Sequence, residues 1–394
     1  MKTKILSLIL FFIGGILFAQ SNQQAQYQNL ADNLLASQSK LTIGGYGEVH
    51  YNQAFDKDTR YNGELDVNRL VMLFGYNFSD KVQFVTEIEY EHVREVFIEQ
   101  AFLQYRLNQF IQFRAGLLLI PMGIINEYHE PTTFNGVERP LIDGKIAPTT
   151  WREIGFGITG NYLPASLKYQ LYLVNGFNGY DGNAKLSGAN GFRSGRQKGA
   201  ESYISSPNLT GKIEYYGIKG LNIGLSGYFG KTQSTLYNKL DKNDVVAVSQ
   251  ADSSVVGISM LGADARYTLG NWQFKGQLYY AGISQSEIYN QFTGSDLGSA
   301  LNGYYIEAAY DLLGSNQKVE AGLIPFVRYE AYNMQASTEG NLQASKANEV
   351  QAITSGITWR MTQGVVFKTD LQFVKPASAD KYSTIFNAGF GIMF

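Results

Sequence analysis

The sequence predicts an all-β fold, a transmembrane antiparallel β-barrel of about sixteen strands. Three observations favour it: strand-like segments with alternating apolar and polar residues, connections that alternate between short and long, and a C-terminal segment that ends on an aromatic residue. The main alternative is a soluble exported protein, because no apolar run after residue 19 approaches the roughly 20 residues that a membrane helix needs. We prefer the barrel, because an open sheet of this size would expose long edges and a large apolar face to water.

The C-terminal segment 382–394 has two different faces. One phase is mostly apolar, and it holds Tyr382, Thr384, Phe386, Ala388, Phe390, Ile392 and Phe394. The other phase is mostly small or polar, and it holds Ser383, Ile385, Asn387, Gly389, Gly391 and Met393. A chain that ends in this way resembles the closing strand of bacterial outer-membrane barrels, in which the terminal Phe strand also serves as the signal for the assembly machinery. We expect this segment to pair with 41–52, with its small and polar phase facing the pore.

Sixteen segments show the alternation of an amphipathic strand, an even number, as closure of a barrel with both termini on one side requires. They are 41–52, 64–78, 81–91, 96–107, 110–120, 151–162, 165–175, 207–217, 220–230, 255–269, 271–283, 301–312, 317–332, 347–361, 364–375 and 382–394. Charged residues keep to one phase of these segments. We assign that phase to the lumen, because a charged Arg or Lys at the lipid midplane costs roughly 2–4 kcal/mol. Trp151, Trp272 and Trp359 lie near predicted strand ends, where aromatic girdles are expected.

The connections between these segments alternate in length. The tight ones are 79–80, 108–109, 163–164, 218–219, 270, 314–316 and 362–364. The others include 53–63, 121–150, 176–206, 231–254, 284–300 and 333–346, with two shorter exceptions near 92–95 and 376–381. Short periplasmic turns opposite long extracellular loops are typical of outer-membrane barrels, whereas a soluble sandwich or propeller has no reason to keep this alternation.

The N-terminal region predicts export. Residues 1–19 combine a basic start, an apolar run and the small residue Ala19, the pattern of a secretory signal peptide. Residues 20–40 are polar with three leucines at helical spacing, and we expect them to form a short periplasmic leader before a barrel that covers 41–394. The expected location is therefore the outer membrane of a Gram-negative cell, with membrane lipid around the barrel wall.

Composition agrees with this class. The chain contains 42 Gly, 27 Tyr and 24 Phe but no Cys, so the exported protein must be held together by packing and hydrogen bonding alone. Abundant Tyr and Phe with a mean hydropathy of −0.17 suit strands that alternate between lipid and water. The formal charge of −2 gives no reason to expect nucleic acid as a partner.

The long third loop, 121–150, which joins the fifth and sixth predicted strands, has an unusual composition. It holds four of the eight Pro residues of the chain together with many apolar residues, among them Ile124, Ile125, Phe134, Leu141 and Ile142. We predict that the loop folds into the lumen, anchored on the wall by these residues. Its charged residues would then face the channel, and they are Glu127, Glu130, Glu138, Arg139 and Lys145. The alternative is a cell-surface loop that packs on its neighbours.

The phase assignment also gives the charges of the lumen wall. The basic candidates are Arg69, Arg114, Lys168, Lys212, Arg266, Lys275, Arg328, Arg360 and Lys368. The acidic candidates are Glu87, Glu89, Glu153, Glu214, Asp264, Glu307, Glu330 and Asp370. The two sets nearly balance, whereas strong ion selectivity needs one sign to dominate at a constriction. Several of these residues could instead form salt bridges along the wall.

Catalysis is not expected. The three histidines, His50, His92 and His129, have no ligand-pair spacing, and no Walker, zinc or nucleophile-elbow motif is present. We therefore expect no enzyme activity, no cofactor and no metal. Transporters energised from the inner membrane carry a large N-terminal plug domain. We do not expect this class, because only roughly 20 residues separate the predicted signal from the first strand.

Several short motifs resemble the phosphate-selective porin O and P family. They are Gly44-Gly45-Tyr46-Gly47-Glu48, Arg114-Ala115-Gly116-Leu117, Ile120-Pro121-Met122-Gly123 and Thr149-Thr150-Trp151-Arg152-Glu153-Ile154-Gly155. The resemblance covers about 41–394 and implies a sixteen-stranded homotrimeric porin whose third loop narrows the lumen. The best-known family members select anions with a ladder of inward arginines and a ring of lysines. Because the lumen charges of this chain nearly balance, phosphate specificity is not carried over.

Two functional expectations follow. The first is a porin for passive diffusion of small hydrophilic solutes, with a weak preference for anions, whose pore-lining residues are Arg69, Arg114, Glu127, Glu130, Glu138, Arg139, Lys145, Glu153 and Arg328. The second is an adhesin or receptor that binds through its external loops, chiefly 176–206 and 231–254. An open conductance of porin size would separate the first from the second.

Overall fold

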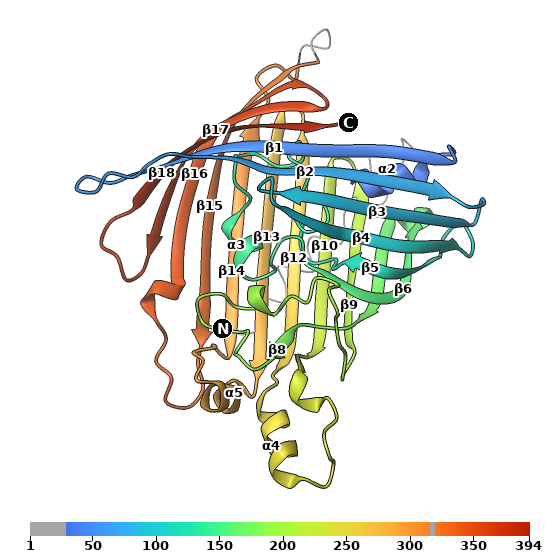
Figure 1. Ribbon diagram of the computed structural model, residues 1–394. Coiled ribbons are helices and arrows are strands. Elements are labelled where there is room, and N and C mark those ends of the chain that lie inside the picture. Colours follow the sequence, from blue (N-terminus) through green and yellow to red (C-terminus); the bar gives the residue numbers. More distant parts are fainter. Residues whose placement is uncertain (1–28, 316–319) are drawn as a thin grey trace, which may run out of the picture.

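The computed structural model describes residues 29–315 and 320–394, and sixteen of its strands form a closed antiparallel barrel (Figure 1). The barrel strands are β1 (Leu41–Phe55), β2 (Glu64–Asn77), β3 (Val82–Glu91), β4 (Glu95–Arg106), β5 (Gln112–Leu119), β6 (Arg152–Tyr162), β7 (Leu167–Val174), β9 (Asn208–Ile218), β10 (Leu221–Lys231), β12 (Gly257–Leu269), β13 (Trp272–Ser284), β14 (Ala300–Tyr310), β15 (Gly322–Ser337), β16 (Glu349–Thr362), β17 (Val365–Pro376) and β18 (Ser383–Met393). The predicted fold class is confirmed, and each of the sixteen predicted segments overlaps one strand of this barrel. The least accurate is 317–332, which begins outside the described residues, whereas β15 starts at Gly322 and continues to Ser337.

The barrel closes between its first and last strands, as predicted. β1 pairs with β18 in an antiparallel register that runs from Tyr46 opposite Met393 to Phe55 opposite Thr384. Beyond β18, the backbone N–H and C=O of Phe394 both bond to Gly45 at 2.9 Å. The remaining barrel strands pair with their neighbours along the chain, so the ladder has no free edge.

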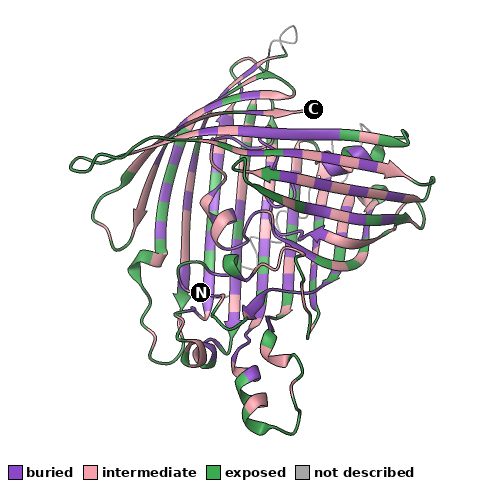
Figure 2. Cartoon of the chain, in the orientation of Figure 1, coloured by how far each residue is buried: buried purple, intermediate pink, exposed green. Residues whose placement is uncertain are grey.

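Buried residues alternate with more exposed ones along the barrel strands (Figure 2). On β13, Gln277 and Tyr279 point inward and are buried, whereas Leu278 and Tyr280 are each 51% exposed on the outer surface. The same alternation places the charged phase of the strands inside and an apolar phase outside, which confirms the phase assignment made from the sequence. The outer surface is therefore the one that suits lipid.

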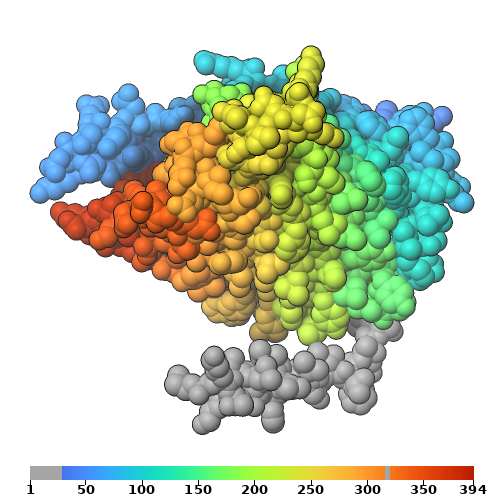
Figure 3. All heavy atoms as spheres, turned by 90° about the horizontal axis from the view of Figure 1, so that it is seen from below, coloured from blue at the N-terminus to red at the C-terminus, as the bar shows by residue number. Residues whose placement is uncertain are grey.

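The connections differ in size at the two ends of the barrel. The helices α4 (Val245–Ser253) and α5 (Ser286–Thr293) belong to long connections at one end, which Figure 3 shows face on. A separate two-stranded parallel sheet of β8 (Asn178–Tyr180) and β11 (Gln233–Ser234) joins two of the long loops. The short elements η1 to η4 are Leu163–Ala165, Arg193–Gly195, Thr235–Tyr237 and Lys346–Asn348. Across 29–315 and 320–394, no helix has the length and apolar character needed to cross a membrane.

Two of the three tryptophans lie where a girdle is expected, and the third does not. Trp272 and Trp359 are 47% and 45% exposed on the outer surface near strand ends. The expectation for Trp151 is wrong, because its side chain is fully buried. The indole stacks on Phe177 and packs against Tyr228 inside the barrel, because the loop that precedes β6 turns inward.

Candidate pore constriction

The third loop, 121–150, crosses the interior of the barrel. Its ends join β5 to β6, but its backbone N–H groups donate to inward side chains of three distant strands. These bonds are Ile124 to Gln277 of β13 (2.6 Å), Leu141 to Glu330 of β15 (2.6 Å) and Val137 to Asp370 of β17 (2.8 Å). The structure therefore places the loop inside the lumen rather than on the outer end of the barrel.

Apolar residues hold the first half of this loop in place. Residues 121–130 are all buried, and Ile124, Ile125, Tyr128 and Phe134 form a compact apolar cluster. Gly123 has a positive φ of 70° and lies so close to Tyr279 of β13 that a Cβ would be 1.8 Å from the phenol oxygen. Only glycine fits there, both for its backbone conformation and for this close approach.

The second half of the loop contains the short helix α3 (Leu141–Lys145). Its Asp143 is buried and accepts hydrogen bonds from Gln277 Nε2 (2.6 Å) and Tyr279 Oη (2.9 Å) of β13. Burial raises the pKa of Asp143 to about 7, although these two hydrogen bonds act in the opposite direction. Near neutral pH this carboxyl group is therefore only about half ionised.

A second segment inside the barrel is the helix α2 (Leu30–Ala36). Asn29 caps it by accepting a hydrogen bond from the backbone N–H of Asp32 (2.8 Å), and Leu30, Leu34 and Leu35 are buried. The glycines Gly44 and Gly75 on β1 and β2 lie directly against its leucines. The apolar face of the helix thus packs on the inner wall. We expected residues 20–40 to form a short amphipathic or disordered periplasmic leader, and 20–28 lie outside the described residues.

The helix α2 is also bonded to the third loop. Asn29 Nδ2 donates to the backbone carbonyl of Glu127 at 2.9 Å. The backbone N–H of Leu30 donates to the carboxylate of Glu130 at 2.7 Å. The loop and the helix therefore form one connected layer across the lumen.

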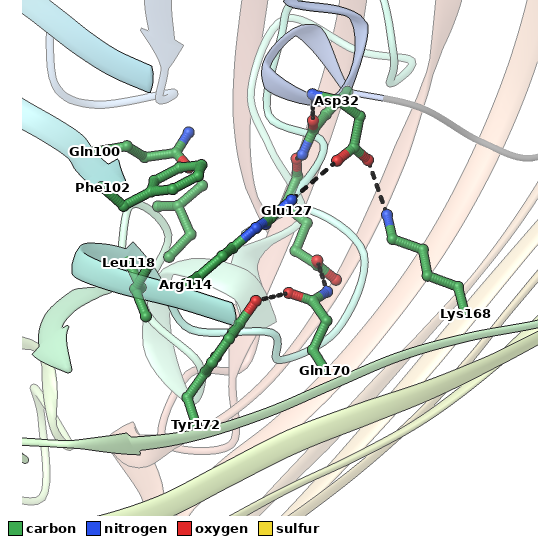
Figure 4. Close-up of a pocket in the computed structure, with 11 residues that line it drawn as sticks. Asp32, Gln100, Phe102, Arg114, Leu118, Glu127, Lys168, Gln170 and Tyr172 are labelled. Atoms are coloured by element: carbon green, nitrogen blue, oxygen red, sulfur yellow. Dashed lines mark hydrogen bonds and ion pairs between the residues drawn. The ribbon is translucent and has the colours of Figure 1, made fainter. Parts of the chain in front are cut away.

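Asp32 of α2 faces two basic residues of the wall, as Figure 4 shows. Its carboxylate lies 2.9 Å from Nζ of Lys168 on β7 and 3.7 Å from the guanidinium of Arg114 on β5. Burial alone would raise the pKa of Asp32, but the charges of Lys168 and Arg114 outweigh it and lower the pKa below its usual value. A small cavity lies between these groups, and Glu127 and Gln170 also line it.

The predicted site residues on the strands are not equally accessible. Arg69 is buried and lies 2.5 Å from Glu48, and Glu153 is buried among hydrogen bonds from Trp151, Tyr228 and the N–H of Gly176. Arg328 is fully buried against two glutamates. Arg114 differs from these residues, since 16% of its side chain stays exposed.

The predicted site residues of the third loop mostly connect the loop to its surroundings. Glu127 contacts Gln170 and lies 3.2 Å from Lys212, while Glu130 accepts from α2 as described. Glu138 keeps 41% of its side chain exposed beside His50, and Arg139 and Lys145 are half-buried. The structure thus brings these residues into the lumen, where several of them form ion pairs.

Arg328 shows how strongly the wall and the loop depend on one another. Its guanidinium lies 3.4 Å from Glu307 and 3.1 Å from Glu330, and it donates to the backbone carbonyls of Asn135 and Glu138 in the loop at 3.3 and 3.2 Å. One cation therefore neutralises two buried carboxylates and ties β14 and β15 to the third loop.

We expect Arg328→Ala to lower the free energy of unfolding by about 3–5 kcal/mol, because it leaves Glu307 and Glu330 buried without their cation. The matched control is Arg360→Ala, whose ion pair with Asp311 is one-third exposed on the arginine side and should cost no more than about 1 kcal/mol. Unfolding in urea, followed by tryptophan fluorescence, measures both values. Equal losses for the two variants would contradict the assigned role of Arg328.

Sequence reasoning missed the contribution of α2 to the lumen. Asp32 and Asn29 were not among the predicted site residues, although leucines at helical spacing and an Asn before them indicated a capped helix. It also gave no role to His129, which lies buried between the third loop and the wall. No spacing pattern could have revealed it, because its partners are about 30 to 40 residues away on two different strands.

The fold is one that solved porins share. Their barrels resemble the closed sixteen-stranded antiparallel barrel of this chain. The chain resembles an anion-selective porin from Comamonas acidovorans, with 13% identity, a TM-score of 0.58, and coverage of 90% of this chain and 99% of the porin. It also resembles the trimer form of OmpT, an outer membrane protein of Vibrio cholerae, with 11% identity, a TM-score of 0.54, and coverage of 90% and 99%.

Sequence comparison places the chain in a family. It is 31% identical over 372 residues to an uncharacterized protein of Aquifex aeolicus (strain VF5), across 90% of this chain and 80% of that protein. The chain belongs to the same family as this protein. No protein-family model matches it.

Proposed function

We propose that the protein is an outer-membrane porin through which small hydrophilic solutes diffuse passively. The observation that carries this proposal is the third loop, which lies within a closed barrel and presents Glu138, Arg139 and Lys145 as partly exposed charges. A barrel with an apolar outer surface and a polar interior is stable across a lipid bilayer and can hold water inside. The extended loop restricts the width of that path without breaking the wall.

We further propose a weak preference for anions, such as phosphate-like solutes. Most inward cations have nearby carboxylates, so their fields are largely local. Arg114 supports the preference, because it shares the carboxylate of Asp32 with Lys168 and keeps 16% of its side chain exposed. Membership of the phosphate-selective porin O and P family, suggested by the motifs around Arg114 and Trp151, is part of the same proposal.

The proposal includes the surroundings of the barrel. The exposed apolar side chains of the outer wall suit contact with lipid or with a neighbouring copy, and we propose a homotrimer, the form named for the Vibrio cholerae protein of similar fold. Phe394 continues the ladder past β18 and its ring is 61% exposed, so it is available to outer-membrane assembly machinery. Residues 1–28, which hold the predicted signal peptide, lie outside the described residues.

Planar-bilayer recording of the purified protein tests the function. We expect discrete conductance steps that do not need a ligand or an energy source. A barrel that stays closed at all voltages, with a ligand bound through 176–206 or 231–254, would instead favour an adhesin or receptor. Conductance steps that persist after those two loops are shortened would show that the open channel does not depend on the external loops.

We expect Arg114→Glu to shift the reversal potential in a salt gradient toward cation selectivity. The change replaces a partly exposed cation by an anion next to Asp32 and Glu127, which already carry negative charge. Lys57→Glu is the matched control, because Lys57 is exposed at the tip of the β1–β2 connection and far from the lumen contacts. An unchanged reversal potential for Arg114→Glu would mean that Arg114 is structural.

A further inference from the structure

Three possible metal ligands converge on one point between the third loop and the wall. They are Glu87 of β3, Glu99 of β4 and His129 of the loop, and all three are buried. Nε2 of His129 lies 3.4 Å from Oε1 of Glu87 and 3.3 Å from Oε2 of Glu99. One atom from each residue lies within 4.8 Å of the other two. Three elements that are separate in the chain thus present ligand atoms to a common centre.

The orientation of the imidazole favours coordination through Nε2. Nδ1 of His129 lies 3.1 Å from the backbone carbonyl of Asn126, which can only accept a hydrogen bond, so Nδ1 carries the proton of that bond. This leaves Nε2 as the atom that faces both carboxylates. Metal-binding histidines in proteins typically hold their second nitrogen in this way, by donation to a carbonyl or carboxylate.

The carboxylate of Glu99 provides an independent observation. Its side chain is fully buried and lies against the carboxyl group of Glu89 on β3, with which it shares a side-chain hydrogen bond. Its nearest cationic atoms are Nε2 of His129 at 3.3 Å from Oε2 and a guanidinium nitrogen of Arg152 at 3.6 Å from Oε1. Both distances exceed the roughly 2.7–2.9 Å of a charge-assisted hydrogen bond. Neither cationic group therefore comes close enough to this buried carboxylate to neutralise it through a short hydrogen bond.

Glu87 is held ready for the same centre. Oε1 accepts a hydrogen bond from Tyr46 Oη at 2.8 Å, and Oε2 accepts one from Gln100 Nε2 at 2.6 Å. These bonds hold the carboxylate in place while Oε1 also lies 3.4 Å from Nε2 of His129. Bonds of this kind orient metal ligands and are often as important as the ligands themselves.

The other buried histidine of the lumen shows that this geometry is distinctive. His50 also lies between two glutamates, but each nitrogen faces a different one: Nε2 is 3.3 Å from Glu48 and Nδ1 is 3.1 Å from Glu138. A protonated ring satisfies both of those carboxylates with its two N–H groups. At His129 both carboxylates face the same nitrogen, and a single N–H cannot serve both at short distance.

We propose that Glu87, Glu99 and His129 bind a divalent transition-metal ion, with Zn²⁺ as the best fit. Zinc accepts imidazole and carboxylate ligands at about 2.0–2.2 Å, so tetrahedral ligand atoms lie roughly 3.3–3.5 Å apart. The two measured separations from Nε2 fall at this spacing. Three protein ligands leave a fourth position for water. The ion links the third loop to β3 and β4 and so fixes the loop near Glu130 and α2.

Metal analysis of the full-length protein, purified in detergent from membranes, tests this site. After treatment with a chelator, the protein is titrated with Zn²⁺ in competition with a chromophoric chelator, and we expect about one tightly bound zinc ion per chain. Glu99→Gln and His129→Ala should each lower the zinc affinity by about a hundredfold or more. His50→Ala is the matched control and should bind zinc as the native chain does. Co²⁺ as a substitute should give visible absorption in the native chain and in His50→Ala, but not in Glu99→Gln or His129→Ala.

Folding of the variants is measured separately by the heat-dependent shift in gel mobility that intact barrels show. Glu99→Gln keeps the size of the side chain and removes a buried charge, so this variant should remain folded even if His129→Ala does not. The proposal is overturned by an absence of zinc binding in the native chain, by equal binding in folded Glu99→Gln, or by loss of binding in folded His50→Ala. Stronger binding of Ca²⁺ than of Zn²⁺ would also overturn it, because it would indicate an all-oxygen site.

Discussion

Deleting residues 126–146 from the third loop should raise the single-channel conductance roughly two- to fivefold, because a sixteen-stranded barrel without an inward loop leaves a wide aqueous channel. The barrel itself should remain closed. The ladder from β1 to β18 contains no residue of the loop, and Arg328 keeps Glu307 and Glu330 as partners. Recording in planar bilayers measures the conductance, and gel mobility measures the barrel.

The control for this deletion is a change in a connection outside the lumen. Replacing 239–250, which includes most of α4 and is exposed or half-exposed, by a short Gly-Ser linker should leave the conductance near the native value. An unchanged conductance after deletion of 126–146 would mean that the loop does not restrict the path. A similar increase in both variants would point to a general loosening of the barrel.

The second large effect is expected from α2. Deleting residues 30–36 should raise the conductance and also shift selectivity toward anions, since it removes Asp32 and leaves Arg114 and Lys168 without their shared carboxylate. Loss of residues 126–146 also removes more acidic than basic residues, so the charge effect of α2 has to be tested by a single substitution. Conductance and reversal potential are measured on the same channels.

A single substitution separates the two contributions of α2. Asp32→Asn keeps the helix and its buried leucines, so it should shift the reversal potential toward anions with little change in conductance. Asp58→Asn, in the exposed β1–β2 connection, is the control and should change neither quantity. If Asp32→Asn leaves the reversal potential unchanged, the field of this carboxylate does not reach the ion path.

The strand framework could be predicted because each strand faces two different solvents. Alternation of the kind seen in Gln277 and Tyr279 against Leu278 and Tyr280 identifies both the strand and its inner face without any knowledge of its neighbours. The closing pair β1–β18 followed from the need to remove edges. The inward path of the third loop could be predicted because the loop contains many apolar residues, which a solvent-exposed loop would not need.

The candidate site could be predicted only in part, because ion pairing depends on register. Whether Arg69 lies free in the lumen or 2.5 Å from Glu48 is decided by the pairing of β1 with β2, which includes a bulge next to Glu48. The seven-residue α2 is too short to be stable alone, so its position depends on tertiary contacts. Trp151 was misplaced for a similar reason, since the direction of the chain before β6 is set by the loop.

The third loop also has a consequence for the order of folding. Closing the wall requires Asn52 to meet Asn387, which are 335 residues apart in the chain. The loop reaches both sides of that seam over shorter separations, because Glu138 accepts from Asn52 at a separation of 86 and Val137 donates to Asp370 at a separation of 233. Long-range pairing is slow because its entropy cost comes before its contacts form. The loop can therefore act as a template that gathers the first and the late strands, and a chain without it should close its barrel more slowly.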